Sequence, residues 1–118
     1  MAGKDNLAGI LSHPVKMPSI PVKYIGVLSR LQQQEKEKKI ELLVLLSGPE
    51  PQRSMFEKMI IKQIAQTENQ TVIVRGLPET QTVIEHHNRN LVFVNYADSH
   101  LMNDYILQSK NIIARSGY

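Results

Sequence analysis

The stretch ELLVLLSGPEPQRSMFEKMIIKQIAQ, residues 41–66, changes from one structural period to another across a short polar hinge. Its first part, residues 42–46, is an unbroken apolar run that is too short for a free-standing helix and has no polar alternation. Such a run is typical of a strand covered on both faces, as in the middle of a parallel sheet. The fold is therefore expected to be organised around a buried parallel strand.

The second part of this stretch predicts an amphipathic helix over residues 51–66, because its apolar residues recur at three- and four-residue steps. Charged residues such as Arg53 and Glu57 stand between the apolar ones. In an open α/β sheet, ligands bind where the carboxyl end of a strand meets the free N–H groups of the next helix. The apolar positions of this helix are Met55, Phe56, Met59, Ile60 and Ile64.

Length and composition are those of one soluble α/β domain. The chain has 118 residues and 42% hydrophobic residues, and it contains no cysteine, which excludes disulfides and thiol chemistry. Residues 1–40 carry seven Lys/Arg and three Asp/Glu, whereas residues 41–118 carry seven and eight, so the basic excess belongs to the leading segment. This small excess is more typical of a solvated surface than of a nucleic-acid site, and we expect no nucleic-acid partner.

The remaining strands and helices are predicted from shorter patterns. Residues 71–75, 91–94 and 111–114 are expected to be strands, and residues 99–109 a helix capped at Asp98 or Ser99. Their alternation predicts a parallel, Rossmann-like sheet with flanking helices and right-handed crossovers.

The other segments carry weaker signals. Residues 1–40 are expected to form an irregular arm and linker with a short strand over residues 22–28, ahead of the sheet domain of residues 41–118. Val83 and Ile84 can anchor a short helix. The adjacent His86 and His87 point in different directions on any regular element, so a surface role is favoured over a metal site.

Polar, small and basic residues follow each predicted strand, and parallel strands place these residues on one rim of the sheet. The common nucleotide motifs of kinases and dehydrogenases are absent from the sequence, as is the nucleophile elbow of hydrolases. Such a rim can hold an anionic ligand with backbone N–H groups and guanidinium groups, or it can be an ordinary set of turn residues and surface cations. The spacing alone leaves both interpretations open.

The segments YIGVLSR, LLVLLSGPEPQR, VIVRGLP, LVFVNYADSHLMND and IIARSGY, taken in order, resemble the C-terminal, donor-binding domain of GT-B glycosyltransferases of the family 28 type. They are similar to glycosyltransferases of Bacteroides-like bacteria, and the resemblance runs from about Asn6 to Tyr118. It implies a cytoplasmic enzyme, peripheral to the inner membrane, that transfers a hexosyl or N-acetylhexosaminyl group from a UDP-linked nucleotide sugar and needs no metal or other cofactor.

The resemblance also implies donor-binding positions on the rim. Pro49 stands where the family has a phosphate-contacting serine, so Ser47 or backbone N–H groups would take that role. No catalytic residue is implied within this chain. The implied donor-binding residues are Arg30, Ser47, Gly48, Glu50, Arg53, Asn95, Tyr96, Arg115, Ser116 and Gly117.

The resemblance covers only half of a GT-B fold, and that half is truncated. The acceptor domain and the rest of the donor domain are the expected partners of this chain, which alone is expected to bind nucleotide sugars feebly and to transfer nothing. Two helices cannot cover four apolar strands, so Ile112 or Ile113 is expected to lie under-packed, covered by Leu7, Ile10 and Leu11 or by self-association. The alternative is a stand-alone α/β module that binds a nucleotide or a protein without catalysis.

Overall fold

The computed structural model describes residues 15–23 and 28–115 of the chain. The chain divides into two compact units, Met1–Arg30 and Leu31–Tyr118. In the first unit, the described residues form bends and extended chain without helix or strand. Residues 24–27 of the predicted strand 22–28 lie outside the described part, and Val22, Lys23 and Leu28 are not in a strand.

The second unit is built on a four-stranded sheet in which every strand is parallel to its neighbours. The strands are β1 (Ile40–Leu45), β2 (Thr71–Val74), β3 (Leu91–Val94) and β4 (Ser109–Ala114), in the order β3-β2-β1-β4. Leu43 of β1 pairs with Val72 of β2 on one side and with Ile112 of β4 on the other. The central position of β1 confirms the prediction from its unbroken apolar run.

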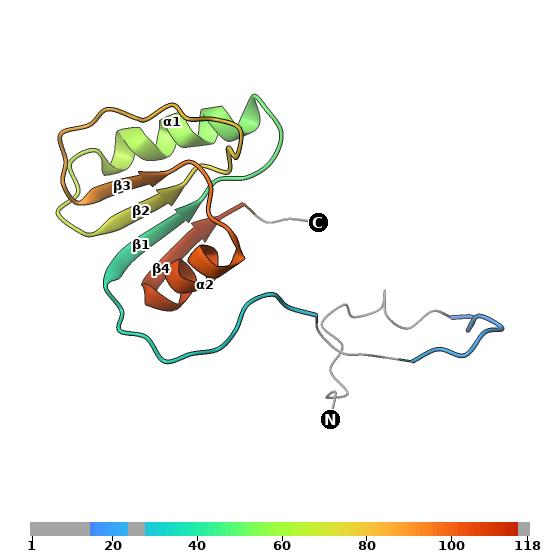
Figure 1. Ribbon diagram of the computed structural model, residues 1–118. Helices are drawn as coiled ribbons and strands as arrows, with labels where there is room; N and C mark the ends of the chain where they lie inside the picture. Colours follow the sequence, from blue (N-terminus) through green and yellow to red (C-terminus); the bar gives the residue numbers. More distant parts are fainter. Residues whose placement is uncertain (1–14, 24–27, 116–118) are drawn as a thin grey trace. The chain divides into compact units, whose positions relative to one another are not determined.

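Two helices cover the sheet, one on each face (Figure 1). Helix α1 (Gln52–Ile64) follows β1, and α2 (Ser99–Gln108) joins β3 to β4. The Asp98 side chain accepts the Leu101 N–H at 2.9 Å and caps α2, as the sequence predicts. The predicted Rossmann-like α/β fold with a parallel sheet is confirmed. No helix in the described part of the chain is long and apolar enough to cross a membrane.

The core has two layers because successive residues of β1 point to opposite faces of the sheet. Leu43 packs with Val72 and Val74 in the layer under α2, whereas Val44 packs with Ile73 in the layer under α1. Leu43, Val44 and Ile73 are fully buried. The side chains of β1 and β2 therefore form the centre of both core layers, against which α2 and α1 pack.

The buried face of α1 differs from the face that the sequence predicts. Met55 and Met59 are 66% and 51% exposed, while the charged Arg53 and Glu57 are buried together with Ile60. Arg53, Glu57 and Ile60 lie four and three positions apart and therefore share one helical stripe. The predicted face is confirmed for Phe56, Ile60 and Ile64, which pack in the core, and is wrong for Met55 and Met59. Hydrophobicity alone favours the two methionines, whereas Arg53 and Glu57 compensate each other's charge at 3.0 Å and are buried instead.

The connection from β2 to β3, residues 75–90, contains no helix. The short helix predicted around Val83 and Ile84 is therefore wrong. Val83 is 79% exposed. The Thr80 and Thr82 carbonyls accept hydrogen bonds from the side chains of Asn95 and Arg75, respectively, and not from the backbone of a helix. The two apolar residues are too few to bury a helical stripe, and the polar contacts hold an extended path.

The polar run ahead of β1 is irregular, as predicted for a linker, but it is bound to α2 and to the start of β4. The backbone of Gln32 exchanges two hydrogen bonds with the buried Asn103 side chain, at 2.9 and 3.1 Å. Lys36 forms an ion pair with Asp104, and the Lys38 ammonium donates to the Ser109 carbonyl. These contacts make residues 31–39 part of the sheet unit.

Strand β4 forms an edge of the sheet, and its apolar residues are under-packed. Ile112 is 45% exposed and Ile113 is 39% exposed, which confirms the expectation for both. They pair with Leu43 and Val44, so they belong to opposite faces of the sheet. Leu7, Ile10 and Leu11, which were predicted to cover this strand, lie outside the described residues, and self-association through it stays a prediction.

The central role of β2 predicts a large effect of core truncation. Replacing the fully buried Ile73 by Ala is expected to lower the free energy of unfolding by about 2–5 kcal/mol, because it leaves a cavity between β2 and α1. Val83→Ala, at a position 79% exposed, should change it by less than about 0.5 kcal/mol. Urea denaturation of both variants measures the difference, and equal effects would contradict the proposed core.

Candidate functional site

The candidate site lies at the carboxyl ends of the strands. From β1 the chain adds β2 and then β3 on one side of β1. It then crosses back over β2 and β1 and adds β4 on the other side of β1. The order β3-β2-β1-β4 therefore reverses between β1 and β4. Ligands of open α/β sheets bind in the crevice outside the strand ends at such a switch point. In this sheet the switch point lies between the residues after β1 and the residues after β4, and this position is called the crevice below.

Gly48 and Arg115 meet in this crevice. Gly48 has a φ of 102°, and a Cβ atom at this position would lie 2.4 Å from Nη1 and 3.3 Å from Cζ of Arg115. The guanidinium group thus lies against the backbone at Gly48, which only a residue without a side chain permits. Arg115 is exposed, and its side chain has no hydrogen bond or ion pair within the described part of the chain.

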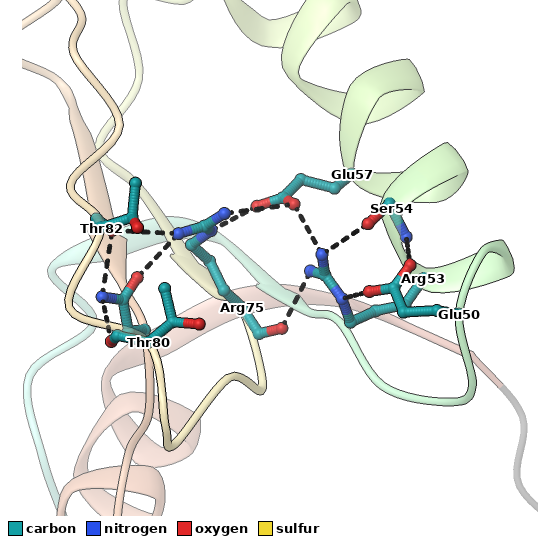
Figure 2. Close-up of polar contacts among 8 residues, drawn as sticks. Glu50, Arg53, Ser54, Glu57, Arg75, Thr80 and Thr82 are labelled. Carbon is teal, nitrogen blue, oxygen red and sulfur yellow. Dashed lines mark hydrogen bonds and ion pairs between the residues drawn. The ribbon is translucent and has the colours of Figure 1, made fainter.

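Beside the crevice, Arg53, Glu57 and Arg75 form a buried ionic cluster (Figure 2). Glu57 Oε2 accepts from Arg53 Nη2 at 3.0 Å, and Glu57 Oε1 accepts from Arg75 Nε. Arg53 Nη1 also donates to the Arg75 carbonyl at 3.2 Å. One carboxylate is therefore shared by two guanidinium groups and connects α1 to the end of β2, and Glu50 supplies the second negative charge that balances the two arginines.

The cluster continues to the end of β3 through Asn95. Arg75 Nη1 donates to Asn95 Oδ1 at 2.8 Å, and Asn95 Nδ2 donates to the Thr80 carbonyl at 2.8 Å and the Thr82 carbonyl at 3.1 Å. Arg75 Nη1 donates to the Thr82 carbonyl as well. The loop after β2 is thereby fixed from both neighbouring strands, as Figure 2 shows for Thr80 and Thr82.

Glu50 occupies the N-terminus of α1. Its Oε2 accepts the Ser54 N–H at 3.3 Å, and its Oε1 accepts from Arg53 Nε at 2.6 Å. The hydrogen bonds from Ser54 and then Arg53 lower the pKa of Glu50. A carboxylate at this position also interacts favourably with the helix dipole. An incoming anion would have to compete with Glu50 for these N–H groups.

The charge of Arg53 is set by two opposing effects. Burial disfavours the guanidinium ion, but the hydrogen bonds that Arg53 donates to Glu50 and Glu57 outweigh burial and raise the pKa of Arg53. The Arg53 guanidinium group stays charged, and it donates hydrogen bonds to Glu50, Ser54 and Glu57. Arg53 is therefore held as a structural cation that fixes the hinge after β1.

The predicted donor-binding residues separate into three groups. Ser47, Gly48 and Arg115 are exposed at the switch-point crevice, and Tyr96 is 57% exposed after β3. Glu50, Arg53 and Asn95 have their side chains bound within the protein. Arg30 is exposed and belongs to the first unit, and Ser116 and Gly117 lie outside the described residues.

Glu57 is the structural centre that sequence reasoning missed, since it was treated as one of the charged residues between apolar positions. The signal was present in the spacing: Arg53 and Glu57 stand four apart, which places opposite charges side by side on a helix. No group of three or more His, Asp or Glu side chains that could hold a metal occurs within residues 15–23 and 28–115.

Comparison with protein-family models, curated protein sequences and solved structures gives no match.

The ionic cluster predicts that Glu57→Gln destabilises the protein strongly. The substitution keeps the shape of the side chain but leaves two buried arginines without their shared negative charge, a loss of about 3–5 kcal/mol in the free energy of unfolding. The matched change at an exposed acid, Glu68→Gln, should cost less than about 0.5 kcal/mol. Urea denaturation at neutral pH tests this, and a Glu57→Gln variant as stable as Glu68→Gln would rule out the cluster as a major source of stability.

The lowered pKa of Glu50 predicts a stability that depends on pH. Its folded pKa lies below the ordinary value of 4.5, so its contribution is complete above about pH 4.5 and is lost as the pH falls through the folded pKa. The wild type should therefore be more stable than Glu50→Gln at about pH 6, and the difference should shrink on acidification. Denaturant midpoints across this range provide the measurement, and a difference that grows on acidification would show the opposite pKa shift.

Proposed function

We propose that this chain forms part of the donor site of a nucleotide-sugar-dependent glycosyltransferase and that the crevice between β1 and β4 binds the diphosphate of a UDP-linked donor. The observation that carries this proposal is the guanidinium group of Arg115, which lies against Gly48 and has no hydrogen bond or ion pair to any described residue. The sequence resemblance supplies the class of enzyme. The same proposal places the intact enzyme in the cytoplasm, at the periphery of the inner membrane.

The chemistry of the crevice suits a diphosphate. A guanidinium group presents a planar fork of N–H donors that matches two phosphate oxygens at once. The space beside the Gly48 Cα is taken by the Arg115 guanidinium group, and the exposed Ser47 lies one residue away in the same turn. Glu50 and Glu57 together neutralise Arg53 and Arg75, so these buried cations add little net attraction for an anion.

In sugar transfer, the diphosphate is the leaving group and gains negative charge as the glycosidic bond breaks. A cation held beside it stabilises the transition state more than the ground state, which is how such a group accelerates the reaction. Within the sheet unit, Arg115 is the exposed cation at the switch point that can supply this charge. The acceptor and its base would come from elsewhere in the intact enzyme, so we assign no catalytic base here.

The proposal predicts weak nucleotide binding that depends on Arg115. Titration of the ¹⁵N-labelled chain with UDP should shift the amide signals of Gly48 and Arg115, with a Kd well above about 1 µM, because the described part of the chain offers few converging groups. Arg115→Gln should weaken binding at least about tenfold, since it removes charge-assisted hydrogen bonds. Arg89→Gln removes an exposed arginine outside the crevice and should leave the Kd unchanged.

Two outcomes would contradict the proposal. An affinity for UDP that Arg115→Gln does not alter would show that the nucleotide binds elsewhere. A submicromolar Kd, or donor hydrolysis by this chain alone, would show that the chain contains a complete donor site. If the whole reading frame yields a protein that binds UDP but never hydrolyses or transfers a UDP-sugar, the alternative of a nucleotide-binding module without catalysis holds.

A further inference from the structure

A groove of about 570 Å³ lies away from the crevice, between the end of α1, residues 84–90 and the first residues of β3. It therefore belongs to the amino ends of the strands, whereas Gly48 and Arg115 follow carboxyl ends. Its volume falls in the range of pockets that hold small organic ligands. No contact described for the ionic cluster involves its lining residues, so it is independent of the proposed donor site.

The groove exists because the connection from β2 to β3 is extended. Asn88 Nδ2 donates to the carbonyls of Ala65 at 3.1 Å and Thr67 at 2.8 Å, which holds the connection to the end of α1. A crossover helix would have filled the space beside α1 with side chains. Instead, Ile61, Ile84 and Leu91 form an apolar lining that stays open to ligands.

An aromatic pair forms part of the lining. The His86 and Phe93 rings have centroids 5.0 Å apart and are tilted by 57°. His86 is exposed, and Phe93 is half-buried with its ring among the residues packed on the layer under α1. Such a surface attracts the apolar body of a ligand and, through the negative face of a ring, a nearby cation.

The titratable side chains that line the groove are two carboxylates and the imidazoles of His86 and His87. Glu68 and Glu85 line it, and neither carboxylate has a hydrogen bond or ion pair within the described part of the chain. No described lysine or arginine lines it, although the chain as a whole carries a net charge of +3. The C-terminus of α1, which carries the negative end of the helix dipole, lies in the same wall.

We infer that this groove binds a small organic cation, namely an amine attached to an apolar or aromatic body. The apolar lining and the His86–Phe93 pair would receive the body of the ligand, and Glu68 and Glu85 would attract its ammonium group. Anions of the same shape are excluded by charge. This assignment gives the chain a second site that differs in charge from the anion-binding crevice.

The test uses phenethylamine as the cationic probe and 3-phenylpropanoate as an anion of similar size. Both are titrated into the ¹⁵N,¹³C-labelled full chain at neutral pH. Phenethylamine should shift the signals of Ile61, Ile84 and Phe93, whereas 3-phenylpropanoate should not. The double variant Glu68→Gln/Glu85→Gln should weaken phenethylamine binding about fivefold, since each exposed ion pair contributes little.

A matched double variant controls for total charge. Glu35→Gln/Glu79→Gln removes two exposed acids outside the groove and should leave the affinity for phenethylamine unchanged. Equal binding of the two probes, or no shift at Ile61 and Phe93 with millimolar phenethylamine, would overturn the inference. Tighter binding of Nα-acetyl-lysine amide than of phenethylamine would also overturn it, because the groove would then fit a lysine side chain of a partner protein.

Discussion

The arrangement of the carboxyl edge depends on one carboxylate, Glu57, which is shared by the buried guanidinium groups of Arg53 and Arg75. Two buried cations are tolerated only if a negative group and further acceptors surround them, since an unpaired buried charge is costly. Glu50, Asn95 and backbone carbonyls provide those acceptors, and no buried polar side-chain atom of the described residues lacks a partner. The cluster therefore fixes the hinge after β1 and the loop after β2 relative to each other.

The buried cluster distinguishes two arginines that stabilise the fold from Arg115, which is exposed. Arg53 and Arg75 form ion pairs with Glu57, whereas the guanidinium group of Arg115 lies against Gly48 at the switch point and has no ion pair among the described residues. A fixed hinge keeps Gly48 in the conformation that permits this contact. The stability of the cluster and the proposed anion site are therefore linked, although the groups that stabilise the fold are different from the groups that would touch the ligand.

The sequence predicts the sheet more accurately than the site, for a physical reason. The apolar run 42–46 is long enough to identify a doubly covered strand, and its alternation with helices determines parallel pairing. The orientation of α1 depends on compensation between charges, and hydrophobicity alone selects Met55 and Met59 in place of Arg53 and Glu57. The contact of Gly48 with Arg115 joins residues distant in sequence and follows only from the order β3-β2-β1-β4.

A crystal structure of the chain with bound UDP would show whether the crevice between β1 and β4 binds a diphosphate, as proposed. Phosphate oxygens are expected within hydrogen-bond distance of the Arg115 guanidinium group and the Gly48 N–H, with Glu50 still capping α1 and Glu57 still between its two arginines. Diphosphate bound at the start of α1 with Glu50 displaced, or bound away from Arg115, would contradict the account.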